Sequence, residues 1–311
     1  MVKKIKQVYL GIDIGGTKIA HALFDRKKLI THTQNVGTPS GRSILNVVSG
    51  FYKKYSKRYE LCGIGISTAG MVSDSGEIVG STGNIKNWYG TEVKKILEKR
   101  HNVPVVVEND ANAAAYAEYK IGLAKGSTPL LMVTLGTGVG GGIVINGKVL
   151  RGKHFAGGEI GHIKLSYSKH RLCTCSKYDC LEAYASGNGL IALAKHYFPD
   201  KKNMHSTKAL FSVAESEKHK DNLLALRAVE DWHFYVAEGI CNLVQVIDPE
   251  KVVLSGGLSL KVNLKLLNKE LKKMLLPAME KSVDKGLVVK SKFGNDAGIL
   301  GACLLVSNLL I

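Results

Sequence analysis

The first part of the chain carries an alternating pattern of apolar and polar residues. Residues 7–16 form an apolar run broken by a glycine pair, residues 18–25 resume the alternation, and residues 28–38 repeat it. Alternation is typical of strands, because successive side chains of a strand point to opposite faces of a sheet. The pattern predicts two strands followed by a third, antiparallel one.

Helical spacing comes next. From residue 41 or 42 to about residue 56, apolar residues recur at intervals of three and four, which predicts an amphipathic helix. Residues 62–70 then indicate a buried strand that ends in a polar loop. Residues 103–122 predict a strand, a polar turn and an Ala-rich helix whose start is capped by Asn109 or Asp110.

The second half of the chain repeats this plan. Residues 129–152 predict a strand, a Gly-rich turn, a second strand and a tight Asn-Gly hairpin. Residues 185–245 have a mostly helical pattern, with a polar, Lys-rich interruption near residues 199–222. A buried strand within 248–260 runs into a glycine pair, and residues 287–310 predict a strand and a final apolar helix.

Length and composition favour a globular protein of two domains. The 311 residues suffice for two domains of ordinary size, and the 34 glycines beside only 6 prolines indicate tight turns rather than disorder. No apolar run approaches the roughly 20 residues needed to cross a bilayer. The N-terminus also lacks the apolar segment of a signal peptide. We therefore expect a cytoplasmic protein.

The chain is strongly basic, with a formal net charge of +17. Such a charge can indicate a nucleic-acid or membrane partner, or a polyanionic substrate. The lysines, however, occur in short runs dispersed along the sequence, without interleaved aromatic residues that would stack on bases. This dispersion favours a solvated basic surface, so neither a specific nucleic-acid partner nor a membrane partner is expected.

Glycines follow the carboxyl ends of three predicted apolar strands, in "LGIDIGGT", "VTLGTGVGGG" and "LSGGLS". A glycine loop after a strand lets backbone N–H groups approach a polyanion without interference from a Cβ atom. None of the loops has the P-loop form, and "GTGVGGG" opens a hairpin rather than the helix that a dinucleotide fingerprint requires. The loops together indicate a phosphate-binding protein outside both of those nucleotide-binding folds.

The segment "CTCSKYDCLEAYASG" holds three of the six cysteines. Cys173, Cys175 and Cys180 are close enough in sequence for three thiolates to bind one ion, which leaves a tetrahedral zinc one ligand short. The other cysteines lie in apolar surroundings, where a free thiol behaves as a small core residue. We therefore expect no disulfide framework, and a fourth zinc ligand must come from elsewhere in the chain.

Motifs along nearly the whole chain resemble, in the right order, those of a known family. "LGIDIGGTKIAHALFD" and "VTLGTGVGGGIVINGKVLRG" look like the two phosphate motifs of the actin-like, hexokinase-like ATPase superfamily, and "VVLSGGLS" resembles its adenosine motif. "VVENDANAAAYAE", "GGEIGHI" and the cysteine segment narrow the resemblance to the ROK family of sugar kinases and repressors.

The resemblance implies an α/β protein with the two-domain, actin-like ATPase (ribonuclease H-like) fold. In this fold each domain is a mixed sheet flanked by helices, and a cleft lies between the domains. We expect a smaller N-terminal domain from residues 1–119 plus 296–311 and a larger domain, residues 120–295, that carries the zinc site.

The resemblance implies that ATP and Mg²⁺ bind beside the glycine loops. Asp13 interrupts an apolar strand, where an unpaired carboxylate is costly. By resemblance it lies near Mg²⁺ and the transferred phosphoryl group, and a structural salt bridge is the alternative. The residues implied to surround the nucleotide are Gly15, Gly16, Thr17, Lys18, Thr137, Gly138, Gly256 and Gly257.

A kinase that acts on a hydroxyl needs a carboxylate within reach of the attacking oxygen. By resemblance Asp110 is the general base that accepts the proton of the sugar hydroxyl, and Asn109 binds sugar hydroxyls. The competing interpretation of Asn109 and Asp110 is an N-cap pair. For the glutamates among the residues named next, the competing interpretation is plain surface charge. The further residues implied to contact the sugar are Glu159, His162, Glu182, Gly70 and Asn84.

The resemblance also implies that His162 completes a closed, structural zinc site with the three cysteines, while its other imidazole nitrogen faces the sugar. The family form of the cysteine segment is "CxCGxxGCxE", and here Ser176 and Asp179 replace the two glycines. The cysteine spacing is kept, so zinc is still expected. At the replaced positions we expect a serine or an aspartate at positive φ, which Asp tolerates better than most residues.

The expected activity is ATP-dependent phosphorylation of a hexose hydroxyl. Conversion of glucose to glucose 6-phosphate is favoured, and an N-acetylmannosamine or N-acetylglucosamine kinase is the alternative. A sugar-responsive repressor or non-catalytic sensor is disfavoured, because only twelve residues precede Asp13 and leave no room for a helix-turn-helix domain. Because the chain is basic, polyphosphate is a less favoured alternative phosphoryl donor. The resemblance also implies a homodimer, since members of the family are commonly dimers.

Overall fold

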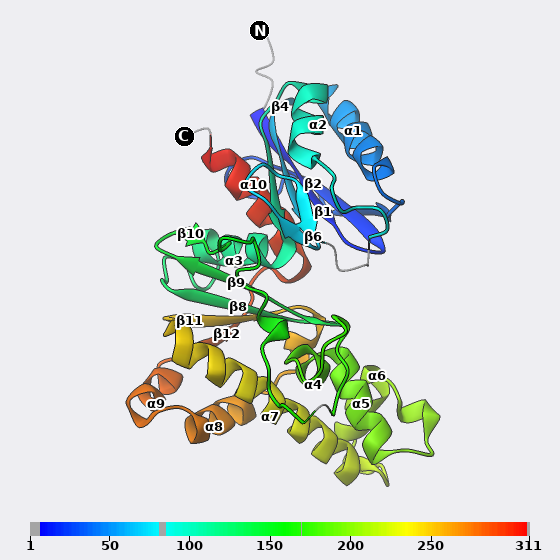
Figure 1. Cartoon of the computed structure of the whole chain (residues 1–311), viewed down its shortest axis with the longest axis vertical. Coiled ribbons are helices and arrows are strands. Elements are labelled where there is room, and N and C mark those ends of the chain that lie inside the picture. Colours follow the sequence, from blue (N-terminus) through cyan, green and yellow to red (C-terminus); the bar gives the residue numbers. More distant parts are fainter. Residues whose placement is uncertain (1–6, 81–84, 169, 310–311) are drawn as a thin grey trace. The chain divides into compact units, whose positions relative to one another are not determined.

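The computed structural model describes residues 7–80, 85–168 and 170–309, apart from the side chain of residue 295. The chain divides into two compact units (Figure 1). Unit 1 comprises Met1–Gly126, Gly142–Gly158 and Asn295–Ile311. Unit 2 comprises Ser127–Gly141 and Glu159–Gly294. Residues 142–158 thus belong to unit 1, whereas the predicted domain division assigns them to the larger domain; that division stays a prediction.

The first sheet is mixed and has the strand order β3-β2-β1-β4-β7. Strand β1 pairs antiparallel with β2 and parallel with β4, while β3 and β7 extend the two sides. The strands are β1 (Gln7–Ile14), β2 (Lys18–Phe24), β3 (Gln34–Gly37), β4 (Glu60–Thr68) and β7 (Val105–Asn109). A two-stranded sheet, β5 (Met71–Val72) and β6 (Ile78–Gly80), follows β4 in the chain.

Helices cover both faces of the first sheet. The even-numbered residues of β1 belong to a buried cluster that includes apolar side chains of α1 (Ser43–Ser56) and α2 (Val93–His101). The odd-numbered residues face α10 (Ala297–Asn308), which lies so close that a Cβ atom at Gly65 would collide with the Ala302 carbonyl. The strand period of two therefore separates an aliphatic face from a face that accepts a close-packed helix.

The second sheet has the order β10-β9-β8-β11-β12 and is also mixed, with β11 parallel to β8 and β12 and with β10 antiparallel to β9. Its strands are β8 (Leu130–Leu135), β9 (Val139–Ile145), β10 (Lys148–Val149), β11 (Lys251–Ser255) and β12 (Val288–Lys290). The remaining helices are α3 (Asp110–Ile121), α4 (Glu182–Ala185), α5 (Gly187–Tyr197), α6 (Thr207–Ala214), α7 (Asn222–Ile247), α8 (Leu264–Met274) and α9 (Pro277–Asp284).

Most of the predicted elements are present. The third antiparallel strand is confirmed, although it covers only the end of the predicted segment, and α1 ends at Ser56 as its spacing predicts. The Asn-Gly hairpin is confirmed as well. Asn146 and Gly147 both have positive φ, at 50° and 76°, which is the combination that a type I′ turn requires.

Three helices have no counterpart in the sequence prediction. Helix α2 comes from a run of basic residues with few apolar ones, and α8 and α9 are similarly rich in charge. The predicted polar interruption near residues 199–222 also contains the short helix α6. In α8 the leucines Leu264, Leu267 and Leu271 recur at intervals of three and four, so its helical pattern is present in the sequence although it was not predicted. The weaker patterns of α2 and α9 become helices through packing of a narrow apolar face, because isolated helices of this length are marginal in water.

No helix in the described ranges is both long enough and apolar enough to cross a membrane.

Candidate functional site

The first glycine loop joins β1 and β2 in unit 1. The Gly15 N–H donates to the Lys18 carbonyl (3.0 Å), which closes a tight turn. Thr38 secures the loop from outside, since its Oγ1 donates to the Gly15 carbonyl at 2.7 Å and its N–H donates to the Thr17 carbonyl at 3.2 Å. Gly16, Thr17 and Lys18 are exposed. The loop thus presents its predicted phosphate-binding residues to solvent on an ordered backbone.

Asp13 lies two residues before this loop, on the face of β1 that α10 covers. Ser67 of the neighbouring strand β4 donates its hydroxyl to Asp13 Oδ1 at 2.7 Å. Burial raises the pKa of this carboxyl, while the Ser67 hydroxyl and the nearby Lys18 oppose the increase. The bonded partner of Asp13 is therefore a neutral hydroxyl, which holds the carboxylate in one orientation without neutralising it.

Asn109 and Asp110 form the junction between β7 and α3. Asn109 Oδ1 accepts from the backbone N–H groups of Ala111 (2.9 Å) and Asn112 (3.1 Å), and its Nδ2 donates to the Gly70 carbonyl at 3.0 Å. Gly70 has a φ of 104°, a conformation that favours glycine. Asn109 therefore caps the helix, as the competing interpretation of this pair predicts. Its capping leaves Asp110 exposed as the first residue of α3.

A buried ion pair, which the sequence analysis did not identify, supports this junction. Glu108 is 1% exposed, and its Oε2 accepts from Arg151 Nη2 (2.5 Å) and Nε (2.8 Å). Its Oε1 accepts from the Asn109 backbone N–H (2.9 Å) and from Asn112 Nδ2 (3.2 Å). Glu108 thus connects Arg151 to the residues on both sides of Asp110, all within unit 1.

We expect Glu108→Gln to destabilise unit 1 by about 3 kcal/mol, because it removes the buried counterion of the partly buried Arg151 guanidinium and leaves only the exposed carboxylate of Asp74 beside it. Thermal unfolding followed by circular dichroism measures this loss. The double variant Glu108→Gln/Arg151→Met is the control, because it removes both charges and is expected to regain part of the stability. Equal stability of Glu108→Gln and the wild-type protein would contradict a structural role for the pair.

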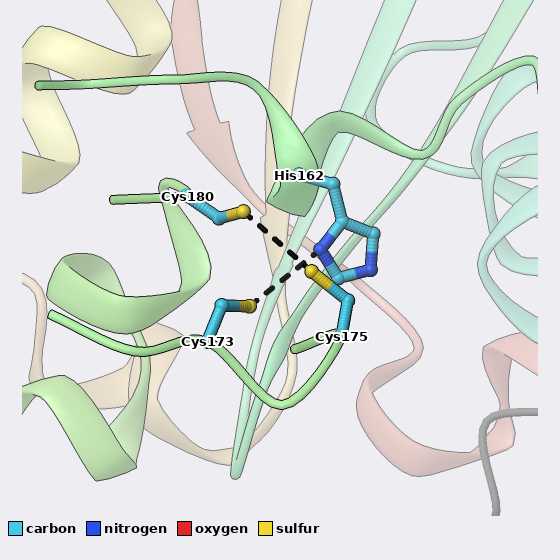
Figure 2. A group of neighbouring side chains, drawn as sticks. All are labelled: His162, Cys173, Cys175 and Cys180. Carbon is cyan, nitrogen blue, oxygen red and sulfur yellow. Dashed lines mark hydrogen bonds between the residues drawn. The ribbon is translucent and has the colours of Figure 1, made fainter. Parts of the chain in front are cut away.

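The predicted zinc ligands converge in unit 2 (Figure 2). The ligand atoms of His162 and the three cysteines all lie within 4.8 Å of one another. Cys173 Sγ is 3.7 Å from His162 Nδ1, and Cys175 Sγ is 3.7 Å from Cys180 Sγ. A tetrahedral zinc with Zn–S distances of about 2.3 Å separates its sulfur ligands by about 3.8 Å. Two of the ligand pairs therefore lie near the separation expected around a single zinc ion, and the four ligand atoms form one compact group.

The turn between these cysteines has the backbone that the replaced glycines imply. Ser176 and Asp179 have φ angles of 62° and 57°, so both adopt the left-handed conformation, as the sequence analysis expects. The Cys173 N–H donates to the Lys177 carbonyl (2.7 Å), and the Ser176 N–H donates to the Cys173 carbonyl (3.0 Å). The turn therefore keeps its shape without glycine.

Asp179 compensates for its backbone conformation through its buried carboxylate. Oδ1 accepts from the Arg171 N–H (2.9 Å) and the Tyr184 hydroxyl (2.7 Å), and Oδ2 accepts from the His170 N–H (3.3 Å). Arg171 in turn stacks over the Tyr184 ring at 4.4 Å. An aspartate at this position thus ties the cysteine segment to α4 in a way that glycine would not.

Two predicted sugar-binding residues flank His162 in unit 2. With Nδ1 turned to the cysteines, Nε2 points away from them and lies 3.9 Å from Glu159 Oε2. Glu182 begins α4, and its Oε2 accepts from the Val139 N–H at 3.1 Å. Glu182 Oε1 accepts from the Thr174 hydroxyl within the cysteine segment. Glu182 therefore shares a hydrogen-bonded framework with the cysteine segment, and Glu159 lies near His162 without a hydrogen bond to it. The predicted residue Asn84 lies outside the described residues.

The second and third glycine loops border a cavity of about 560 Å³ in unit 2. Gly256 has a φ of 83° and lies where a Cβ atom would collide with the Leu135 carbonyl, and the Gly187 N–H donates to the Gly136 carbonyl at 2.8 Å. This volume is typical of small-molecule sites. The lining residues are Gly136, Thr137, Gly187, Asn188, Ile191, Thr207, Lys208, Phe211, Gly257, Leu258 and Lys261.

Among the lining residues, only Thr137 and Gly257 are predicted to bind the nucleotide. The predicted residues Gly138 and Gly256 are not in the lining but are their neighbours in the chain. The sequence analysis missed the contributions of α5 and α6. One signal was present in "ASGNG", where Ser186 caps α5 by accepting from the Gly189 N–H and leaves glycine at the helix start. Ile191, Phe211 and Leu258 give the cavity an apolar part, and Lys208 and Lys261 add positive charge.

Comparisons with known proteins give matches over nearly the whole chain. A model of the ROK family matches residues 9–308. A glucokinase of Streptomyces coelicolor is 33% identical over 310 residues, which cover 94% of this chain and 95% of the relative. An N-acetyl-D-glucosamine kinase of Vibrio atlanticus is 33% identical over 314 residues, which cover 96% and 99%.

A solved structure extends the similarity to the fold. The crystal structure of a ROK family glucokinase from Streptomyces griseus in complex with glucose and AMPPNP has a TM-score of 0.75 and 28% identity to this chain, with 97% and 99% of the two chains covered. The expected α/β fold of actin-like ATPases is therefore confirmed. The chain belongs to the ROK family.

Proposed function

We propose that this protein phosphorylates the 6-hydroxyl of glucose with ATP as donor and Asp110 as general base. It is an ATP-dependent sugar kinase, and the choice of glucose and of the base is the proposal. The observation that carries it is the β7–α3 junction, where Asn109 takes over the capping of α3 and the Asp110 carboxylate stands exposed beside it. An exposed carboxylate on a rigid junction can accept a proton from a bound hydroxyl.

The nucleotide is proposed to bind at the three glycine loops. The 560 Å³ cavity would take the adenosine part, with Ile191, Phe211 and Leu258 against the base. The phosphates would lie at Gly15, Gly16, Thr17 and Lys18 of the first loop and at Thr137 and Gly138 of the second. Mg²⁺ prefers oxygen ligands, and the Asp13 carboxylate is the group that we propose for it, directly or through water. The metal would neutralise charge on the transferred phosphoryl group.

We propose that Glu159, His162 and Glu182 bind the sugar hydroxyls, together with Asn109. Each carboxylate can accept from two neighbouring hydroxyls, and the second hydrogen of Asn109 Nδ2 can donate. His162 Nε2 is available for this role because Nδ1 is directed at the cysteines. Gly70 and Asn84 are proposed to close the pocket.

Zinc is the ion that best suits the cluster of His162 and the three cysteines. One imidazole and three thiolates form a closed tetrahedral set, with no position left for a catalytic water. Burial raises the pKa of the Cys173 thiol to about 12, and a bound cation would favour its thiolate form. The proposed role is structural: the zinc would fix the orientation of the His162 ring.

An N-acetylhexosamine kinase is the second candidate, and the similarity to the N-acetyl-D-glucosamine kinase of Vibrio atlanticus over nearly the whole chain favours it. A coupled assay with ATP separates the two activities. It compares kcat/KM for glucose, mannose, fructose, allose, N-acetylglucosamine and N-acetylmannosamine. We expect the highest kcat/KM for glucose. A preference for an N-acetylated sugar would support the second candidate, and no turnover of any sugar would contradict the kinase assignment.

The remaining proposals concern donor and assembly. ATP is proposed over polyphosphate, and the same assay with polyphosphate in place of ATP compares the two donors. We also propose that the protein is a cytoplasmic homodimer, as the family resemblance implies. Light scattering coupled to size-exclusion chromatography measures the mass against the 33.6 kDa of one chain.

A further inference from the structure

Unit 1 contains a cavity whose lining includes none of the residues proposed for catalysis, nucleotide binding or zinc. It has a volume of about 470 Å³, within the range of small-molecule sites, and is formed by α1 and α2, which lie side by side (Figure 1). Its lining residues are Asn46, Ser49, Gly50, Lys53, Arg100 and His101.

The spacing of these residues places them on one side of each helix. The four from α1 follow one another at intervals of three, one and three residues, so they share one face of that helix. Arg100 and His101 are the last two residues of α2. A lysine, an arginine and a histidine therefore meet around one opening.

Hydrogen bonds hold two of these side chains in position. Arg100 Nη1 donates to Asn46 Oδ1 (3.1 Å) and to Ser49 Oγ (3.4 Å). His101 Nε2 forms a hydrogen bond with Ser49 Oγ (2.9 Å), and its ring stacks on the Tyr52 ring with centroids 4.2 Å apart. Only one of the guanidinium nitrogens of Arg100 makes these contacts. The other N–H groups are available in a fixed fork that matches the oxygens of a phosphate.

The positive charges of the cavity lack acidic partners. Across the described ranges, no carboxylate lies within 4.0 Å of Lys53 Nζ or the Arg100 guanidinium. Elsewhere in unit 1, Arg151 has two carboxylate partners. Two unpaired cations and the N–H or hydroxyl groups between them produce a local field that attracts an anion.

Gly50 provides an independent argument. It lies inside α1, where glycine costs about 0.5–1 kcal/mol relative to alanine. Its φ is not positive, and a Cβ atom built there would meet no atom within 4 Å. Neither backbone conformation nor packing therefore requires glycine. Gly50 is exposed and lines the cavity, so the lack of a side chain leaves the α1 backbone accessible there.

Stabilisation of the helix ends is the simpler explanation of the charges, since Lys53 and Arg100 lie in last turns, where cations favour the helix dipole. That effect explains charge alone. The helix dipole accounts neither for the glycine that lines the cavity nor for the hydrogen bonds that position Arg100 and His101 beside the same opening.

We propose that this cavity binds a small phosphorylated metabolite through its phosphate group, with Arg100 and Lys53 as the principal contacts. The site shares no residue with the proposed kinase machinery and does not depend on the identity of the sugar.

Isothermal titration calorimetry with inorganic pyrophosphate and with glucose 6-phosphate as probes tests the proposal, with glucose as the unphosphorylated control. We expect the cavity to contribute to the binding of both probes. Arg100→Gln and Lys53→Gln should each weaken that contribution about tenfold. Gly50→Leu should abolish that contribution by filling the cavity. Gly50→Ala, a matched change that adds only a methyl group, should retain binding and raise the melting temperature slightly.

Lys57→Gln removes a charge from the end of the same helix without lining the cavity, and should leave binding unchanged. Equal weakening by Lys57→Gln and Arg100→Gln would indicate a general charge effect and overturn the proposal. Unchanged binding in Arg100→Gln and Gly50→Leu, or no binding of either probe by the wild-type protein, would overturn it too. Both variants keep the residues proposed for catalysis, so the sugar assay should give wild-type turnover whether or not the cavity binds phosphate.

Discussion

Asp110→Asn is expected to lower kcat for sugar phosphorylation about 1,000-fold, within the range that general-base catalysis contributes. Asparagine has nearly the same shape but cannot accept the hydroxyl proton. The helix start should survive the change, because an amide oxygen can replace Asp110 Oδ1 as acceptor of the Ala111 N–H (2.8 Å) and Asn109 still supplies the cap. Steady-state kinetics with ATP and glucose measure the loss.

Two controls separate chemistry from structure. The melting temperature of Asp110→Asn should stay near that of the wild-type protein, and glucose binding by calorimetry should persist. Asn109→Ala is the matched variant: it removes the cap and the bond to Gly70, so it should cost about 1 kcal/mol of stability as well as sugar affinity. Near wild-type turnover by a folded Asp110→Asn protein would exclude Asp110 as the base.

Cys173→Ser is expected to abolish stable zinc binding, because it removes one ligand of four from the site. The loss of a metal belongs to the small class of strongly destabilising changes, and we expect about 3 kcal/mol, or about 10 °C in melting temperature. Sugar affinity should fall as well, since the His162 ring would no longer be held by the metal. Elemental analysis, thermal unfolding and the KM for glucose measure the three effects.

Cys62→Ser is the matched control, since Cys62 is a half-buried cysteine outside the cluster. It should keep one zinc per chain and wild-type KM. Chelation of the wild-type protein should reproduce the Cys173→Ser effects, and added zinc should reverse them. Well under one zinc per chain in freshly purified wild-type protein would contradict the zinc proposal, and an unchanged melting temperature after chelation would contradict its structural role.

Local patterns predicted the parts of the molecule whose signals lie close together in the chain. The alternation in residues 7–16 predicted β1, and the strand, turn and helix of residues 103–122 placed Asp110 at a helix start. The cysteine spacing indicated a metal, and the replaced glycines predicted positive φ at Ser176 and Asp179. In each case the physical cause, a side-chain period or a backbone conformation, acts within a few residues.

Other features depend on packing and became visible only in the tertiary structure. The partner of Glu108 is Arg151, 43 residues away, and the α5 and α6 residues that line the large cavity come together only when both helices pack beside the glycine loops. Helix α2 lacks a strong local pattern and forms because its few apolar residues join the core of the first sheet.

The sequence by itself thus determined the succession of the strands and main helices, the glycine loops and the clustering of three cysteines, because these follow from local periodicity and motif spacing, whereas the candidate base follows from the family resemblance. The tertiary structure alone decided that Asn109 caps α3, that Asp13 is held by Ser67, that His162 turns Nδ1 to the cysteines, and that a basic cavity opens over Gly50. Each of these depends on side chains from separate segments meeting within hydrogen-bond distance, which no pattern along one segment encodes.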